Sequence, residues 1–104
     1  MASSKAYLDF IMEQLSLLEQ ISYRKMMGEY IIYYQGKIIG GIYDDRFLLK
    51  PVKTVQSLLP DFTYEIPYEG AKPMILAENI EDKEFMAKLI MAMYDELPAP
   101  KSKK

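Results

Sequence analysis

Apolar residues recur at helical spacing near both ends of the 104-residue chain. Ser3 and Ser4 can cap the first helix, which we predict over residues 4–19. Its apolar stripe consists of Tyr7, Leu8, Ile11, Met12, Leu15 and Leu18. Asn79 can cap the last helix, which we predict over about residues 80–95. Its apolar stripe consists of Phe85, Met86, Leu89, Ile90, Met93 and Tyr94.

Between these helices the pattern changes to short apolar runs separated by turn residues, which indicates strands. We predict four of them, over residues 21–27, 30–34, 37–43 and 46–50. Gly28 separates the first two, and Gln35-Gly36 and Asp44-Asp45 form two-residue hairpin turns. Residues 51–59 favour a short helix closed by Pro60, and FTYEI and PMILA each fit one more short strand. The pattern therefore predicts an α+β domain, with an antiparallel sheet of four to six strands and the terminal helices packed on one face.

The two hairpin turns predict which side chains share a face of the sheet. Tyr33 should lie opposite Ile38, Ile31 opposite Gly40, and Ile42 opposite Phe47. The face without any charge then consists of Ile31, Tyr33, Ile38, Gly40, Ile42, Phe47 and Leu49. We expect the helices to cover this face, with Gly40 leaving room for a helix to approach closely.

The opposite face mixes aromatic, aliphatic and basic side chains. Ile32, Ile39 and Leu48 would lie together on this face, near Gly41. Their combined apolar area is too large to leave in water. We therefore predict that a partner covers it, most simply a second copy of the chain, which would make a homodimer. The predicted interaction surface consists of Tyr30, Ile32, Tyr34, Lys37, Tyr43, Arg46, Leu48 and Lys50.

The same face allows a second interpretation, a nucleic-acid-binding protein that uses tyrosine and basic side chains. Bases stack on tyrosines, and Lys or Arg neutralises phosphates. The formal net charge of -2 opposes this interpretation, and GKIIGGIY does not match the strand motif of RNA-recognition domains. We rank it second to a protein-interaction module, and an unrecognised enzyme third.

The composition removes several kinds of chemistry. The chain has no Cys and no His, so a thiolate nucleophile, a disulfide framework and a cysteine zinc site are excluded, and the commonest metal ligand is missing. The glycines fit neither a P-loop nor a dinucleotide-binding loop. The acid pairs Asp44-Asp45, Glu81-Asp82 and Asp95-Glu96 fit a turn, a helix start and a helix exit. We therefore predict no catalytic, cofactor-binding or metal-binding residues.

The length fits one domain, which we place at residues 1–96, followed by a flexible polar tail over residues 97–104. The first ten residues do not resemble a signal peptide, and no apolar run is long enough to span a bilayer. We therefore expect a cytoplasmic protein without a membrane partner.

The stretch YRKMMGEYIIYYQGKIIGGIYDDRFLLK resembles the opening of the TfoX N-terminal domain family. That pattern is R-x-M-F-G, then a hairpin with a glycine turn and a strand that ends in Lys. Met27 replaces its usual Phe, and the positions that match are Arg24, Met26, Gly28, Gly36 and Lys50. The segment YEIPYEGAKPMILAENIEDKEFMAKLIMAMYDEL looks like the family's close, so the resemblance covers nearly the whole chain.

The resemblance implies a fold similar to the secretion-chaperone-like architecture and a non-enzymatic regulatory or protein-interaction module. The namesake proteins regulate natural competence for DNA uptake and carry a second, C-terminal domain. We expect a stand-alone domain here, because the chain ends where that second domain would begin. No catalytic residues are attached to the family, so none is carried over.

Overall fold

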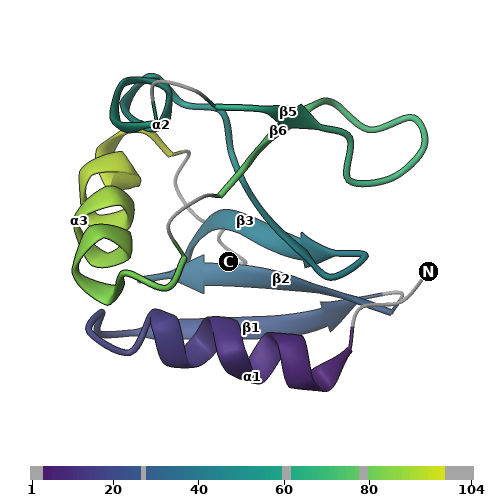
Figure 1. Ribbon diagram of the computed structural model, residues 1–104, viewed down its shortest axis with the longest axis horizontal. Helices are drawn as coiled ribbons and strands as arrows, with labels where there is room; N and C mark the ends of the chain where they lie inside the picture. The colour runs from purple at the N-terminus through teal and green to yellow at the C-terminus, as the bar shows by residue number, and fades with distance from the viewer. Residues whose placement is uncertain (1–3, 27, 60–61, 78–79, 98–104) are drawn as a thin grey trace, which may run out of the picture.

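The computed structural model of the protein describes residues 4–26, 28–59, 62–77 and 80–97. Its elements are α1 (Lys5–Gln14), β1 (Ile21–Met26), β2 (Glu29–Tyr34), β3 (Lys37–Tyr43), β4 (Arg46–Leu49), α2 (Lys53–Leu58), β5 (Tyr64–Glu65), β6 (Met74–Leu76), α3 (Lys83–Met93) and the 3₁₀ turn η1 (Tyr94–Glu96). The strands form one sheet in the order β1-β2-β3-β4-β6-β5, and every neighbouring pair is antiparallel (Figure 1). The α+β prediction, with α1 and α3 on one face of the sheet, is confirmed.

Side-chain caps define the starts of the two long helices. The Ser4 hydroxyl accepts a hydrogen bond from the Tyr7 backbone N–H at 3.1 Å, as predicted for α1. The Asp82 carboxylate accepts one from the Phe85 N–H at 3.1 Å, so Asp82 is the N-cap of α3. The predicted cap Asn79, the helix-closing Pro60 and the motif residue Met27 lie outside the described residues.

Both predicted hairpin turns are present. Gln35 and Gly36 have φ values of 51° and 85°, and Asp44 and Asp45 have 54° and 57°. Two consecutive positive φ values are the geometry that matches the twist of hairpin strands. In the second turn the pairs Tyr43–Arg46 and Ile42–Phe47 follow the predicted register.

The register between β2 and β3 differs from the prediction because β3 contains a bulge. Next to the turn, Tyr33 pairs with Ile38 as expected. One step further, Ile32 pairs with Gly40, so Ile39 is an extra residue in β3. A one-residue shift moves side chains to the other face of a strand. The face assignment of β2 was therefore wrong, and so was that of Ile38 and Ile39.

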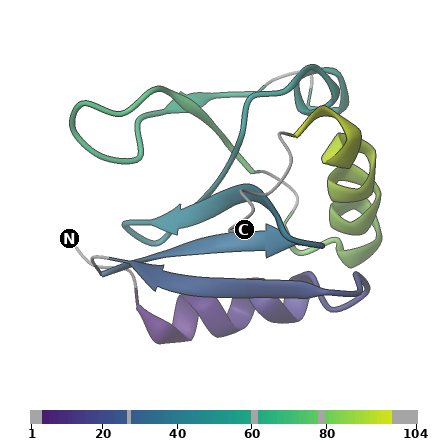
Figure 2. The same cartoon turned by 180° about the vertical axis from the view of Figure 1, so that it is seen from behind.

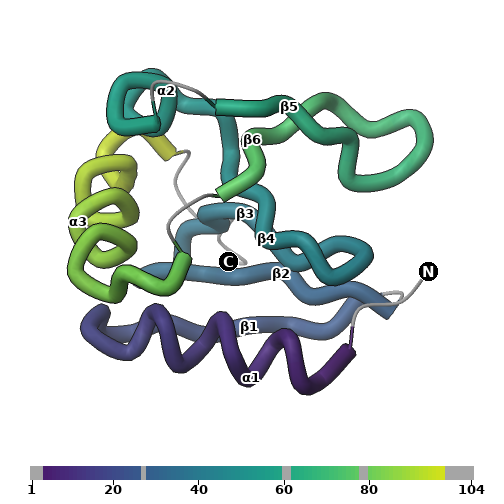
Figure 3. Tube along the Cα trace, viewed as in Figure 1, coloured from purple at the N-terminus to yellow at the C-terminus, as the bar shows by residue number. Residues whose placement is uncertain are grey.

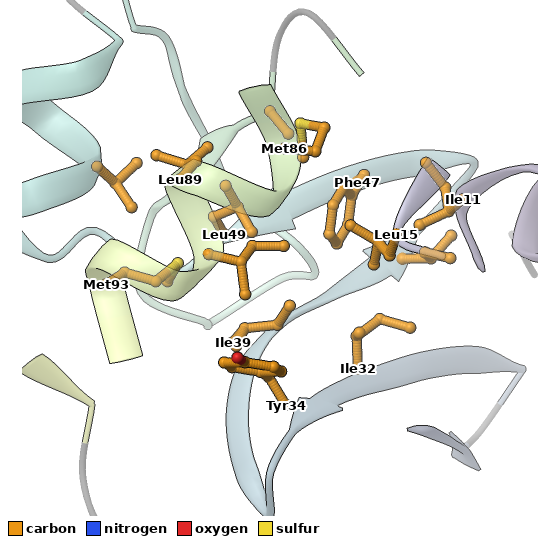
Figure 4. Close-up of a cluster of buried hydrophobic side chains, with 14 of the residues drawn as sticks. Ile11, Leu15, Ile32, Tyr34, Ile39, Phe47, Leu49, Met86, Leu89 and Met93 are labelled. Atoms are coloured by element: carbon orange, nitrogen blue, oxygen red, sulfur yellow. The ribbon is translucent and has the colours of Figure 1, made fainter. Parts of the chain in front are cut away.

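The core forms between the helices and the face of the sheet that carries Tyr30, Ile32, Tyr34, Ile39, Ile42, Phe47 and Leu49. Figure 4 shows Ile32, Tyr34 and Ile39 on the same side as Phe47 and Leu49, facing side chains from α1 and α3. Phe47 and Leu49 were predicted correctly, because no bulge separates β3 from β4. Leu97, which was predicted to begin the tail, is buried in this core.

Gly40 is required for a different reason from the one predicted. A Cβ at this position would overlap the Leu48 carbonyl oxygen and come within 2.9 Å of the Leu49 Cα. The close neighbour is thus the backbone of β4 rather than a helix. Both the bulge at Ile39 and the absence of a side chain at Gly40 let β3 bend toward β4.

Two features of the overall arrangement position the functional surface. In Figure 2, which shows the molecule from behind, β1 lies in front of α1 and forms an edge of the sheet. The connection between β5 and β6 extends away from the body of the domain (Figure 3). We call this segment, residues 66–73, the β5–β6 loop.

Candidate protein-interaction surface

The side of the sheet that faces away from the core, here called the outer face, carries residues from four adjoining strands. Register and alternation place on it Arg24, Met26, Glu29, Ile31, Tyr33, Ile38, Gly41, Tyr43, Arg46 and Leu48. None of these ten residues belongs to the hydrophobic core cluster that the described residues form with the helices. The exposed part of the outer face is therefore the candidate surface for a partner.

A groove of about 420 Å³ lies on the outer face and is lined by Met26, Glu29, Ile31, Tyr43 and Tyr68. The strands β1, β2 and β3 supply its floor, and the β5–β6 loop supplies Tyr68. Tyr68 is 62% exposed and Met26 is 45% exposed. A groove of this size, with an apolar lining and one carboxylate, can hold a side chain or a small molecule.

Arg46 holds the β5–β6 loop beside the groove. Its guanidinium forms an ion pair with Glu65 at 2.7 Å and donates a hydrogen bond to the Ile66 carbonyl oxygen at 3.3 Å. Its Nε also donates to the carbonyl oxygen of Tyr43 at 3.1 Å. Arg46 thus ties the end of β5 to the residue that forms the groove wall.

Two tyrosine rings make the aromatic corner of the groove. The ring centroids of Tyr43 and Tyr68 are 6.0 Å apart, and the rings are tilted by 52°. Rings in this arrangement form two walls that meet at an angle. A ligand that packs against the exposed side of this corner would meet the electron-rich face of an aromatic ring, which attracts cations.

Glu29 brings negative charge to the same corner. Its carboxylate accepts a hydrogen bond from the Asp44 backbone N–H at 3.2 Å, which holds it at the β3–β4 turn. Burial raises the pKa of the Tyr43 hydroxyl, and the nearby Tyr68 and the Glu29 carboxylate raise that pKa further. Tyr43 therefore stays protonated at neutral pH.

The predicted interaction surface is divided between the two faces of the sheet. Tyr30, Ile32 and Tyr34 are 5%, 0% and 7% exposed and belong to the core cluster, because the bulge in β3 inverts the predicted faces of β2. Lys37 pairs with Tyr34, and its ammonium donates to the Tyr94 carbonyl oxygen and lies over the Tyr94 ring. Those four residues cannot form an exposed surface together.

The other four predicted residues lie elsewhere. Tyr43, Arg46 and Leu48 are on the outer face, as predicted, although Leu48 is 0% exposed. Lys50 lies just beyond β4, and its backbone N–H donates to the Ile39 carbonyl oxygen at 3.0 Å. Within the predicted set, Tyr43 is the one residue that lines the groove.

The prediction did not include Met26, Glu29, Ile31 and Tyr68. Met26, Glu29 and Ile31 alternate along β1 and β2, so the correct register would have placed them on one face. Tyr68 gives no such signal, because it lies in an irregular segment far along the chain. Its position depends on how the β5–β6 loop folds back beside β3.

Two further features are absent from the described part of the chain. No group of three or more acidic side chains there is arranged to hold a metal ion. None of the described helices is long and apolar enough to cross a membrane.

The six-stranded antiparallel sheet has helices on one face and a groove on the other, which makes the protein an α+β domain with one open sheet face. The chain belongs to the TfoX N-terminal domain family, whose sequence profile matches residues 13–97. It is 30% identical over 105 residues to the "Uncharacterized 12.7 kDa protein in trpE 5'region" of Spirochaeta aurantia. That alignment covers 100% of this chain and 91% of the relative. No solved structure matches the chain significantly.

Proposed function

We propose that this protein is a non-enzymatic regulatory module of the competence-regulator type, which acts by binding another protein through its outer face. The observation that carries the proposal is the groove beside Tyr68, where a large aromatic side chain is 62% exposed at the rim of an apolar hollow. Aromatic residues at such rims are the usual anchors of protein interfaces. A second copy of the chain is the first partner to consider.

The chemistry of the groove supports binding rather than catalysis. Glu29 is the carboxylate in its lining, and the remaining lining residues are two tyrosines, Met26 and Ile31. General acid–base catalysis requires a group with a pKa near the working pH and a partner within hydrogen-bond reach. Burial moves the pKa of Tyr43 upward, away from neutrality. Family membership supports the same proposal, and we place its action in the cytoplasm.

The nucleic-acid interpretation depended on exposed tyrosines and basic side chains, and the structure buries or occupies several of them. Base stacking needs accessible ring faces. Tyr30 and Tyr34 are 5% and 7% exposed, and Lys37 is engaged with Tyr94. We therefore do not extend that alternative.

A capture experiment from native cell extract tests the proposed function. Wild-type protein would be compared with Tyr68→Glu, and the matched control is Tyr64→Glu, which changes an exposed tyrosine of β5 outside the groove. We expect a protein that binds the wild type and the control but is lost with Tyr68→Glu. The proposal fails if both variants retain the same material, or if the captured material is nucleic acid released steeply by salt.

A further inference from the structure

We propose that two copies of this chain associate through their outer faces, with Arg24 of each copy inserted into the groove of the other. This inference rests on the proposed function, because it names the partner and the contact that the outer face would make. It adds the chemical reason for the pairing, which is the fit between a guanidinium and an aromatic corner that contains a carboxylate.

The groove has the features of a cation receptor. Tyr43 and Tyr68 provide two ring walls with centroids 6.0 Å apart, and Glu29 provides the negative charge. Met26 and Ile31 provide an apolar lining for an aliphatic stem. A guanidinium stacks on aromatic rings and pairs with a carboxylate, and its three-carbon stem tolerates apolar surroundings.

Arg24 is the arginine that can supply the cation. The chain has two arginines, and Arg46 is already bound to Glu65 and to the Ile66 carbonyl oxygen. Arg24 is exposed, and it takes part in none of the ion pairs found among the described residues. It does not line its own groove. An arginine in this position is free to enter a partner.

The position of Arg24 fits a twofold axis. In a symmetric dimer one surface patch must be complementary to itself. Arg24 pairs with Ile31 across β1 and β2, and Ile31 lines the groove, so donor and receptor are neighbours on one face. A twofold axis that lies between the two outer faces, parallel to them, and runs between Arg24 and the groove places each Arg24 over the groove of the other copy. The outer face thus carries both halves of the contact.

A charge-swap experiment tests this arrangement. The variants Arg24→Glu and Glu29→Arg would be studied alone and mixed, by sedimentation velocity with the wild type as reference. Each variant alone places like charges at both contacts, so we expect its dimer dissociation constant to rise at least about thirtyfold. Mixing the two variants restores opposite charges at both contacts. We therefore expect the mixture to form heterodimers with nearly the wild-type dissociation constant.

Two matched controls separate the contact from a general charge effect. Lys25→Glu makes the same charge change at the next residue of β1, whose side chain alternates to the other face. Glu69→Arg repeats the second change on a carboxylate outside the groove lining. Both controls should dimerise like the wild type. Circular dichroism on every variant shows whether the fold is intact, which matters for Glu29→Arg because Glu29 accepts the Asp44 N–H.

Three results would overturn the inference: a monomeric wild type, a dimer that survives Arg24→Glu as well as it survives Lys25→Glu, or a folded mixture that does not associate. None of them decides the proposed function, since capture of another protein through Tyr68 is measured separately. If the wild type dimerises but captures no other protein through Tyr68, the dimer inference stands and capture of a different partner fails.

Discussion

At the scale of single residues, two glycines serve different purposes. Gly40 is surrounded by the backbone of β4, so any side chain would meet atoms that cannot move independently. Gly70 has nothing within 4 Å of an added Cβ, but its φ is 87°, which is unfavourable for other residues. One glycine is required by space and the other by backbone conformation.

The two glycines therefore predict different responses to the same substitution. Gly40→Ala should lower the free energy of unfolding by about 3 kcal/mol or more, because β3 and β4 must separate to admit the methyl group. Gly70→Ala should cost about 1 to 2 kcal/mol, the strain of a left-handed alanine. Urea denaturation of both variants measures the difference. Equal losses would mean that β4 can yield beside Gly40.

At the scale of elements, the bulge in β3 decides which residues reach the core. Ile38 pairs with Tyr33 on the outer face and is partly exposed, whereas Ile39 is 0% exposed in the core. A regular hairpin would have placed Ile38 in the core and Ile39 on the outer face. The same substitution at each isoleucine therefore tests whether the bulge is present.

We expect Ile39→Asp to abolish stable folding, because it buries a carboxylate without a partner at a cost of several kcal/mol. Ile38→Asp should cost about 1 kcal/mol and leave the fold intact, because its side chain can reach water on the outer face. Circular dichroism and thermal melts would compare the two variants. The reverse order of stability would contradict the observed register.

The element α2 is stabilised by a residue from the far end of the domain. Its N-cap Val52 has no side chain that can cap, and the Glu96 carboxylate of η1 accepts hydrogen bonds from the Thr54 N–H at 3.0 Å and from the Thr54 hydroxyl. These bonds lower the pKa of Glu96 below its ordinary value. The sequence pattern indicated only a helix exit at Asp95-Glu96.

This contact predicts a specific titration. NMR should show the Glu96 pKa below the ordinary value for a glutamate, and Thr54→Val should raise that pKa toward the ordinary value because the hydroxyl bond is lost. A carboxyl group whose pKa is lowered by folding stabilises the protein above its unfolded pKa. That contribution disappears as the pH falls through the folded pKa, so the wild type should lose its advantage over Thr54→Val in acid. An unchanged Glu96 pKa in the variant would show that the hydroxyl is not the cause.

At the scale of the whole molecule, one face of the sheet forms the hydrophobic core and the other carries the proposed binding surface. The core face joins α1, α3 and the strands into one hydrophobic cluster. The outer face carries the groove and Arg24 without contributing to that cluster. Changes on the outer face should therefore affect association more than folding.

Thermal unfolding at several protein concentrations tests this separation. A dimer that binds only in the folded state raises the melting temperature as concentration increases. We expect this dependence for the wild type and for Lys25→Glu. Arg24→Glu should remove the dependence but keep the melting temperature of the most dilute wild type. If Arg24→Glu melts lower at every concentration, Arg24 contributes to the monomer fold.

The sequence by itself determined the local structure and the family. Period-3.6 and period-2 patterns identified the main helices and strands, and the two turns were correct because their residues tolerate positive φ values. The pairing of β3 with β4 was also predictable, since a short regular hairpin follows from its turn alone. The family pattern around Arg24, Met26 and Gly28 pointed to the family that the profile match confirmed.

Only the tertiary structure decided which face of β2 is core. The bulge at Ile39 leaves no local signal, because isoleucine and glycine satisfy both registers, and packing of Tyr30, Ile32 and Tyr34 against the helices selects one of them. The groove also depends on tertiary structure, since Tyr68 joins Met26, Glu29 and Ile31 only when the β5–β6 loop lies beside β3. Spacing along the chain specifies neighbours within an element and across a tight turn. Contacts between distant segments depend on the packing of the whole core.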